Sequence, residues 1–293
     1  MRHRIVGALG AAIGLTLALN ALAAPAHKAR LIGSFTWQGE DERFGGFSGL
    51  ELSDDGLTLT TISDRGSYVT ARLTRQDGRV TAIDADPIKT LRDYRATDIK
   101  GGGDAEGLAI AQDGRWFVSL EAFHRVVAYS SLDTASWVPI PDEFTKLQHN
   151  SGLEALAVDD AGRLYAIPER SGGVTQPFSV YRFEDKVWTT PFTLPRDGGF
   201  LPVGADFGPD GRLYLLEREF SGFGFRSRVR RFTLDGDAIA GSEILLTTST
   251  WTHGNLEGIA VWQDTQGTHL TMISDDNFQS FLRTELVDYV VTD

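Results

Sequence analysis

The sequence predicts an all-β protein, a β-propeller of five blades that is closed by pairing of its N-terminal and C-terminal strands. One phrase, in which two short apolar runs flank a turn rich in Asp and Gly, occurs five times, and an acidic residue follows its second run. The copies begin at Ser48, Glu106, Glu154, Val203 and Glu257, so their starts lie 58, 48, 49 and 54 residues apart. Repeats of this period built from strand residues indicate a closed radial β architecture.

Each copy is expected to form a β-hairpin followed by two further strands. In the second copy the runs 108–111 and 116–120 flank Asp113-Gly114, where Gly supplies the positive φ that a tight turn needs. The later strands of the second, third and fourth copies are predicted at 126–130, 137–140, 178–183, 187–194, 228–234 and 242–247. Four strands in each unit describe one propeller blade.

The two ends of the chain predict how the ring closes. The fifth copy offers three strands, at 259–262, 269–274 and 281–291, whereas the run 31–37 precedes the first copy and lacks a partner. Pairing of these ends would complete the last blade and remove a free sheet edge. Six blades remain an alternative if the connection 67–103 contains a degenerate blade. A β-sandwich is a weaker alternative, because it does not require such regular units.

Residues 1–24 are predicted to be a secretory signal peptide, and residues 25–293 a single propeller domain. A basic start is followed by an apolar run over 5–19 and a small-residue motif, with cleavage expected near Ala23-Ala24. The apolar run is shorter than a membrane span requires, so we expect a periplasmic or secreted protein that is not membrane-embedded, with a retained anchor as the alternative. The absence of cysteine excludes a disulfide framework.

The net charge of −12 argues against a nucleic-acid partner, because such proteins cluster Lys and Arg on one surface. Familiar hydrolase motifs are also missing: Gly46-Phe47-Ser48-Gly49 has the wrong spacing for a nucleophile elbow, and neither a His-Glu-x-x-His helix nor a phosphate-binding loop occurs. Any hydrolysis is therefore expected to proceed without a covalent nucleophile. A protein partner is not indicated by any feature of the sequence.

Hairpin geometry predicts that the acids of the five copies gather at one mouth of the ring, opposite the Asp-Gly turns. The first strand starts at this face and the second returns to it. Carboxylates in this number suit a hard cation, for which we expect Ca²⁺, with Mg²⁺ or Mn²⁺ as alternatives. The expected metal ligands are Asp64, Glu106, Glu121, Glu154, Glu169, Glu217, Glu257 and Asp275. The alternative is that these acids bind amides or arginines and only lock the blades together.

Other side chains at this mouth supply candidate binding and catalytic groups. Three arginines directly follow repeat acids, and with one histidine they are the predicted substrate-binding residues: Arg65, Arg170, Arg218 and His253. Glu106, Glu154 and His124 are the predicted catalytic residues, because carboxylates and imidazoles transfer protons in hydrolysis.

The repeat phrases resemble the bacterial family described by the esterase-like activity of phytase, a phytase-like domain. The resemblance is carried by Phe47-Ser48-Gly49-Leu50, Asp104-Ala105-Glu106-Gly107-Leu108, Gly152-Leu153-Glu154-Ala155-Leu156, Asn255-Leu256-Glu257-Gly258-Ile259 and the strand end Ile62–Gly66. It covers nearly all of the chain after the leader and implies an exported propeller with esterase or phosphoesterase activity. The better-known β-propeller phytases are calcium-dependent and six-bladed, with lysine-rich phosphate sites that this chain lacks, so none of their catalytic residues is carried over.

The expected function is that of an exported, metal-assisted hydrolase whose substrate is a small-molecule ester or phosphate ester. Two alternatives use the same mouth: a non-catalytic periplasmic propeller that binds a ligand or protein, and a lactonase-type propeller hydrolase. A propeller fold hosts all three functions, so the architecture alone does not choose between them.

Overall fold

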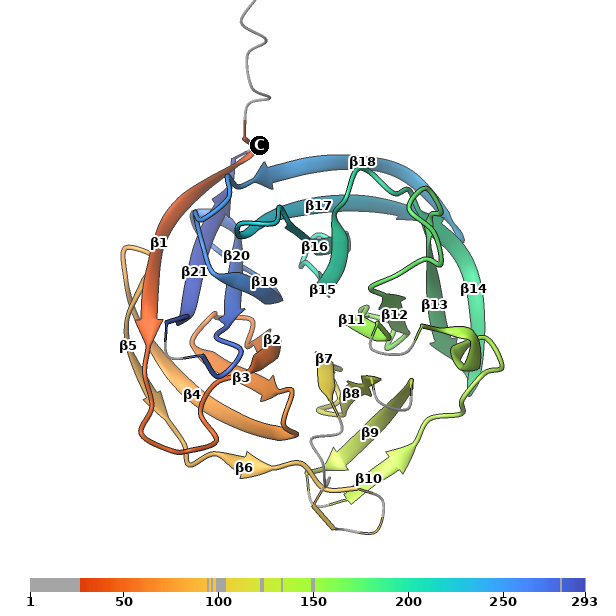
Figure 1. Cartoon of the computed structure of the whole chain (residues 1–293), viewed down its shortest axis with the longest axis horizontal. Coiled ribbons are helices and arrows are strands. Elements are labelled where there is room, and N and C mark those ends of the chain that lie inside the picture. The colour runs from red at the N-terminus through yellow and green to blue at the C-terminus, as the bar shows by residue number, and fades with distance from the viewer. Residues whose placement is uncertain are drawn as a thin grey trace, which may run out of the picture.

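The computed structural model describes residues 27–292, except residues 94, 96, 99–103, 122–123, 133, 149–150 and 280. The predicted signal peptide therefore lies outside the described residues. The described chain forms five antiparallel sheets arranged radially around a central axis (Figure 1), which confirms the predicted five-bladed β-propeller. In this part of the chain, no helix has the length and apolar character that a membrane crossing needs.

The first four blades follow one another along the chain, each beginning with its innermost strand. The first contains β2 (Phe47–Leu52), β3 (Thr58–Ser63), β4 (Ser67–Gln76), β5 (Arg79–Ala85) and the short β6 (Lys89–Thr90), which pairs with β4. The second contains β7 (Ala105–Ile110), β8 (Trp116–Leu120), β9 (Arg125–Ser131) and β10 (Thr134–Trp137). The third contains β11 (Leu153–Val158), β12 (Leu164–Pro168), β13 (Phe178–Glu184) and β14 (Val187–Leu194). The fourth contains β15 (Leu201–Phe207), β16 (Leu213–Phe220), β17 (Phe225–Asp235) and β18 (Ala238–Thr247).

The fifth blade joins the two ends of the chain, as the sequence predicts. It contains β19 (Asn255–Asp264), β20 (Gly267–Asp275), β21 (Thr284–Val291) and, as its outermost strand, β1 (Ala29–Trp37). β1 runs antiparallel to β21, from Ala29 opposite Val291 to Trp37 opposite Thr284. Because the N-terminal strand covers the last blade, the ring closes by main-chain hydrogen bonds rather than by side-chain contacts alone.

Two details differ from the sequence-based expectations. The described residues of the connection 67–103 contribute β4, β5 and β6 to the first blade, so the six-bladed alternative is not supported there. β10 covers Thr134–Trp137 rather than 137–140. Pro139 and Pro141 explain the earlier end, since proline has no backbone N–H to continue a strand ladder.

Apolar side chains between adjacent blades form the core, and the centre of the ring is packed from backbone. In the largest cluster, Leu216 and Val229 of the fourth blade pack with Leu270 and Met272 of the fifth. At the centre, a Cβ atom on Gly204 would lie 2.6 Å from the carbonyl oxygen of Glu257. The glycine of the repeat phrase therefore allows one inner strand to touch the next.

Candidate functional site

A β-bulge at the start of every inner strand sets one residue of each blade outside the regular ladder. The register skips a residue between Leu153 and Ala155 in the third blade and between Leu256 and Gly258 in the fifth, and equivalent shifts occur in the other three blades. The residues at this bulge position are Ser48, Glu106, Glu154, Val203 and Glu257. Bulges of this kind re-aim side chains and are common next to functional sites.

Each blade places another residue at the mouth, at the end of its second strand. This residue pairs with the one that stands two places before the bulge residue in the sequence. The backbone N–H of Glu169 donates to the carbonyl oxygen of Gly152 at 3.0 Å, and Asp64 and Glu121 make the same bond in their blades. In the fourth and fifth blades this register is occupied by Arg218 and Asp275. The five residues at this strand-end position are thus Asp64, Glu121, Glu169, Arg218 and Asp275.

The fourth blade places Arg218 at this position, where the sequence analysis assigned Glu217. The register pairs Glu217 with Pro202, one step earlier. Glu217 is fully buried, and its carboxylate accepts hydrogen bonds from Arg228 Nε at 2.7 Å and Arg230 Nη2 at 2.6 Å. For this residue the geometry is that of a structural ion pair within the fourth blade, because both carboxylate oxygens bind guanidinium groups of the adjacent strand β17.

Arg218 of the fourth blade connects acids of the third and fifth blades into one network. Its Nη1 donates to Asn255 Oδ1 at 2.8 Å and to the carboxylate of Glu257, and its Nη2 donates to Glu169 Oε1 at 3.3 Å. Asn255 Nδ2 also donates to Glu257 Oε1 at 2.8 Å. The guanidinium therefore compensates part of the negative charge of the seven carboxylates at the bulge and strand-end positions, Glu257 among them.

Burial is the largest cause of the raised carboxyl pKa values at this mouth. It raises the pKa of Asp64 to about 6 and that of Asp275 to about 8, with the charge of Glu257 adding to both. Burial, together with the charges of Glu257 and Glu121, raises the pKa of Glu106 well above its ordinary value. The pKa of Glu154 is raised in the same way, by burial and then by the charge of Glu106. The cluster therefore holds protons at a pH at which exposed carboxylic acids are ionised.

Three further predicted site residues, His124, Arg65 and Arg170, lie around this cluster, and each has different contacts. His124 adjoins Glu121 in a left-handed conformation (φ 43°), and its ring lies where a Cβ atom on Gly152 would be. The Arg65 guanidinium carbon lies 3.2 Å from the ring centroid of Phe278. Arg170 Nε donates to Ser151 Oγ at 2.8 Å, while half of its side chain stays exposed.

His253 is held by partners other than the acids of the mouth. Its Nε2 lies 2.8 Å from Tyr289 Oη, and its Nδ1 lies 3.7 Å from Glu285 Oε1, with 6% of the side chain exposed. Both ring nitrogens are thus engaged within the fifth blade, so the geometry does not favour the predicted contact with a substrate.

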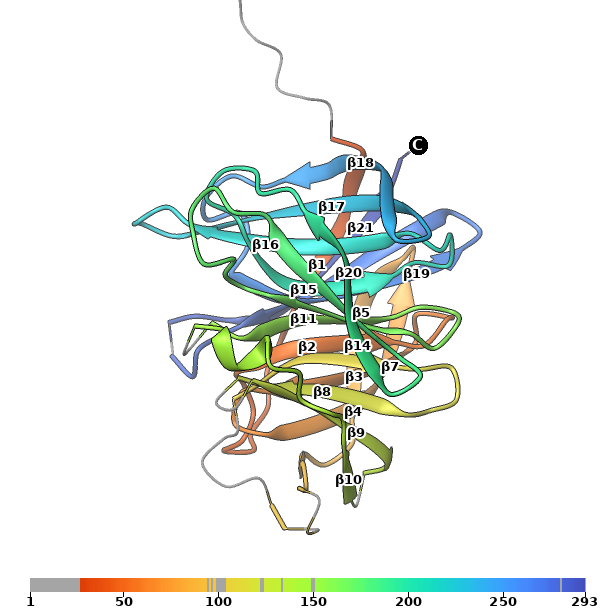
Figure 2. The same cartoon turned by 90° about the vertical axis from the view of Figure 1, so that its right-hand side faces the viewer.

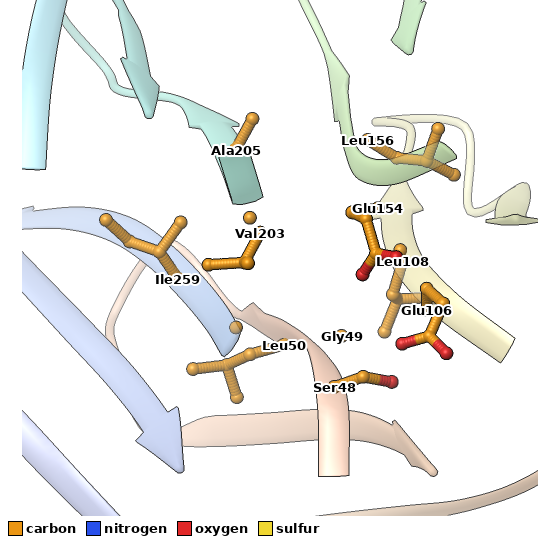
Figure 3. Close-up of a pocket in the computed structure, with 13 residues that line it drawn as sticks. Ser48, Gly49, Leu50, Glu106, Leu108, Glu154, Leu156, Val203, Ala205 and Ile259 are labelled. Atoms are coloured by element: carbon orange, nitrogen blue, oxygen red, sulfur yellow. The ribbon is translucent and has the colours of Figure 1, made fainter. Parts of the chain in front are cut away.

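Below the mouth the central channel narrows to a small cavity (Figure 3). Its volume is about 10 Å³, which is room for roughly one water molecule. The inner strands line it, with the Glu106 and Glu154 side chains beside Ser48 and Gly49. A ligand bound at this mouth therefore cannot pass through the ring.

Two further acids, Glu51 and Asp206, lie deeper on the inner strands and are not among the residues predicted from the sequence. Glu51 Oε1 accepts a hydrogen bond from the backbone N–H of Ile110 at 3.1 Å, and Asp206 Oδ2 accepts one from Val261 at 2.7 Å. Burial raises the pKa of Asp206 to about 7. A signal was present: these acids stand three residues after the bulge in the two blades whose bulge residue, Ser48 or Val203, is not acidic.

The donor set at the mouth fits a cation in its chemistry but not in its present arrangement. Among the described residues, no three His, Asp or Glu side chains converge as the ligands of one metal ion. The chemistry of the set nevertheless matches an oxygen-preferring cation, because carboxylates and the Asn255 amide provide hard oxygen ligands. Arg218 already binds three of these oxygens as an internal cation. Cation binding would thus require rotation of side chains rather than a change of fold.

Comparison with known proteins identifies the family. A family model described as "Phytase-like: Esterase-like activity of phytase" matches residues 42–278. No curated protein sequence matches the chain. The PQQ-bound aldose sugar dehydrogenase of Streptomyces coelicolor is similar in structure, with a TM-score of 0.47 and 14% identity over 90% of this chain and 99% of that one.

Two further solved structures are similar at the same level. A gluconolactonase of Xanthomonas campestris has a TM-score of 0.47 and 15% identity over 85% of this chain and 76% of that one. A virginiamycin B lyase of Staphylococcus aureus, solved with quinupristin, has a TM-score of 0.45 and 12% identity over 89% of this chain and 99% of that one.

Proposed function

We propose that this chain, which belongs to the phytase-like family, hydrolyses small phosphoric or carboxylic esters at the acidic mouth of its propeller. The observation that carries the proposal is the gathering of acids from four blades at the bulge and strand-end positions, where Arg218 binds Glu257 and Glu169. Export through the leader predicted at residues 1–24 forms part of the proposal.

Arg218 is the group best placed to bind the oxygen that gains negative charge during hydrolysis. A guanidinium has five N–H donors, and three hydrogen bonds of Arg218 are used by Asn255, Glu257 and Glu169. Two donors remain for a phosphoryl or carbonyl oxygen. A donor fixed in advance by its neighbours stabilises a transition-state charge without reorganisation. Arg170, half exposed beside Glu169, is a second candidate for the same task.

Asp64 is a candidate for the base that takes a proton from the attacking water. With its pKa near 6, it is mostly ionised at pH 7 and yet basic enough to accept a proton. The water oxygen then bonds to the carbonyl carbon or phosphorus, the ester bond breaks, and the alkoxide leaving group takes a proton. His124, beside Glu121, is the proposed source of that proton.

Ca²⁺ is the proposed cofactor, with Glu106, Glu154 and Glu257 as its ligands together with Asp275. When bound, such an ion polarises a phosphoryl or carbonyl oxygen and lowers the pKa of bound water. Burial first and mutual repulsion second raise the pKa values of Glu106 and Glu154, and the charge of the ion would offset the repulsion. Mg²⁺ and Mn²⁺ remain alternatives, because they accept the same oxygen ligands.

Substitution of both central acids, Glu106→Gln with Glu154→Gln, is expected to lower hydrolysis of 4-nitrophenyl phosphate or 4-nitrophenyl acetate by about 10³-fold or more. The measurement is release of 4-nitrophenolate by the mature protein with added calcium. Glu184→Gln, the same change at an exposed strand residue, is the matched control and should retain full activity.

Three outcomes would contradict the proposal. Turnover of both esters no faster than the buffer blank would exclude ester hydrolysis and favour the binding-module alternative. Turnover of γ-butyrolactone but of neither ester would favour the lactonase alternative. Full activity in the double variant would place the chemistry outside the acidic mouth.

A further inference from the structure

Aromatic side chains are exposed at the hairpin between β16 and β17 and on the neighbouring connection between β18 and β19. Phe220 is 61% exposed, Phe223 is 83% exposed and Trp251 is 71% exposed, although each could bury a large apolar surface. With Phe225, these residues form what we call the aromatic ridge. Exposed apolar clusters of this kind usually mark a binding surface, whereas single exposed apolar residues need no explanation.

The ridge is a built feature rather than a chance gathering of side chains. The backbone N–H of Trp251 donates to the carbonyl oxygen of Phe225 at 3.2 Å, which joins the two loops. The Phe220 and Phe225 rings lie 5.2 Å apart, and a Cβ atom on Gly224 would meet the Trp251 ring at 2.8 Å. Trp251 also holds a left-handed backbone conformation (φ 71°), which is rare for a bulky residue and costs free energy.

The ridge is continuous with the acidic mouth through Arg218. The Arg218 guanidinium carbon lies 5.6 Å from the Phe225 ring centroid, while the same guanidinium binds Glu257. Figure 2 shows the hairpin between β16 and β17 extending outward from one face of the ring. The aromatic surface thus starts where the proposed oxygen-binding group lies and leads away from it along this hairpin.

We propose that the aromatic ridge binds an apolar acyl or aryl group of the substrate, so that the chain prefers esters with a long apolar part. This inference rests on the proposed ester hydrolysis and specifies its substrate class. Three of the four ridge residues are Phe, which has no polar tip to bond a sugar hydroxyl, so an apolar group suits the surface better than a carbohydrate. Its position beside Arg218 places such a group next to the ester being cleaved.

The test compares 4-nitrophenyl octanoate with 4-nitrophenyl acetate in the wild type and in the variant Phe220→Ala with Trp251→Ala. We expect kcat/KM in the wild type to favour octanoate by about tenfold or more, because each buried methylene adds to binding. The ridge variant should lose most of this preference and keep its rate on acetate. Trp137→Ala, which removes a half-exposed tryptophan from β10 of the second blade, is the control and should keep the preference.

Binding of the uncleaved amides octanamide and acetamide, measured by calorimetric titration, separates this inference from the proposed hydrolysis. If no ester is hydrolysed, tighter binding of octanamide by about tenfold that is lost in the ridge variant would still support the ridge as an apolar subsite. Equal affinity for the two amides, or an octanoate preference that the ridge variant retains, would overturn the inference. Circular dichroism of the ridge variant confirms that any loss does not come from unfolding.

Discussion

Replacement of Arg218 by glutamine is expected to lower kcat/KM for ester hydrolysis by about 10²- to 10³-fold. Two effects combine. The variant loses the donor proposed for the transition-state oxygen, and it leaves Glu257 and Glu169 without the guanidinium that binds both. Breaking such a buried pair from one side typically costs about 3 to 5 kcal/mol of stability. Kinetics with 4-nitrophenyl acetate and thermal unfolding measure the two effects separately.

Two further variants make the Arg218 result specific. Arg218→Lys keeps the positive charge but loses the planar fork that reaches Glu257, Asn255 and Glu169 together, so it should recover stability better than activity. Arg226→Gln breaks the partly exposed ion pair with Glu219 on the same hairpin and should change either quantity little. Wild-type activity in Arg218→Gln would contradict the role assigned to this residue.

Calcium-free protein is expected to lose stability as the pH rises from about 5 to 8.5. Carboxyl pKa values raised in the folded state mean that the native protein holds more protons than the unfolded chain in this range, so unfolding is favoured at higher pH. Asp275, raised to about 8, and Asp64, raised to about 6, set the window. Asp275 alone corresponds to an effect on the order of several kcal/mol.

Thermal melts in the presence of chelator measure this dependence. The Tm should fall by about 5–15 °C across the window, and Asp275→Asn should flatten the curve because an amide does not titrate. Asp113→Asn, at an exposed hairpin turn on the far face, serves as the matched control. Added calcium should restore the Tm most strongly at high pH, since it binds ionised carboxylates. A Tm that rises with pH in chelator would show that the mouth acids are not protonated in the folded protein.

The sequence predicts the architecture well because the repeat phrase occurs five times, once in each blade. The spacing of the phrase indicates the number of blades, and the unpaired run 31–37 indicates the strand that closes the ring, which is β1 beside β21. The structure explains the glycine that follows the bulge residue in the repeat phrase. A Cβ atom on Gly258 would lie 2.8 Å from the carbonyl oxygen of Ser48, so only glycine allows the inner strands to approach this closely.

The candidate site is predicted less completely, because side-chain facing depends on register. The fourth blade has Val203 where three other blades have glutamate, so no acid on its first strand helps to fix the register from the sequence. The residue at its strand-end position lies one place after the predicted one. A shift of one residue in a strand moves a side chain to the opposite face, which exchanges Glu217 for Arg218. His253 has two partners on β21, which are Tyr289 and Glu285. They meet His253 only in the folded ring.

The most direct test of the acidic mouth as a cation-dependent hydrolytic site is a calorimetric titration of calcium into chelator-treated mature protein at pH 7.5. The account predicts saturable binding in wild type, with an affinity weakened at least about 30-fold by Glu106→Gln with Glu154→Gln and unchanged by Glu184→Gln. Absence of calcium binding in the wild type would contradict the proposed cofactor and would reassign these acids to structural contacts between blades.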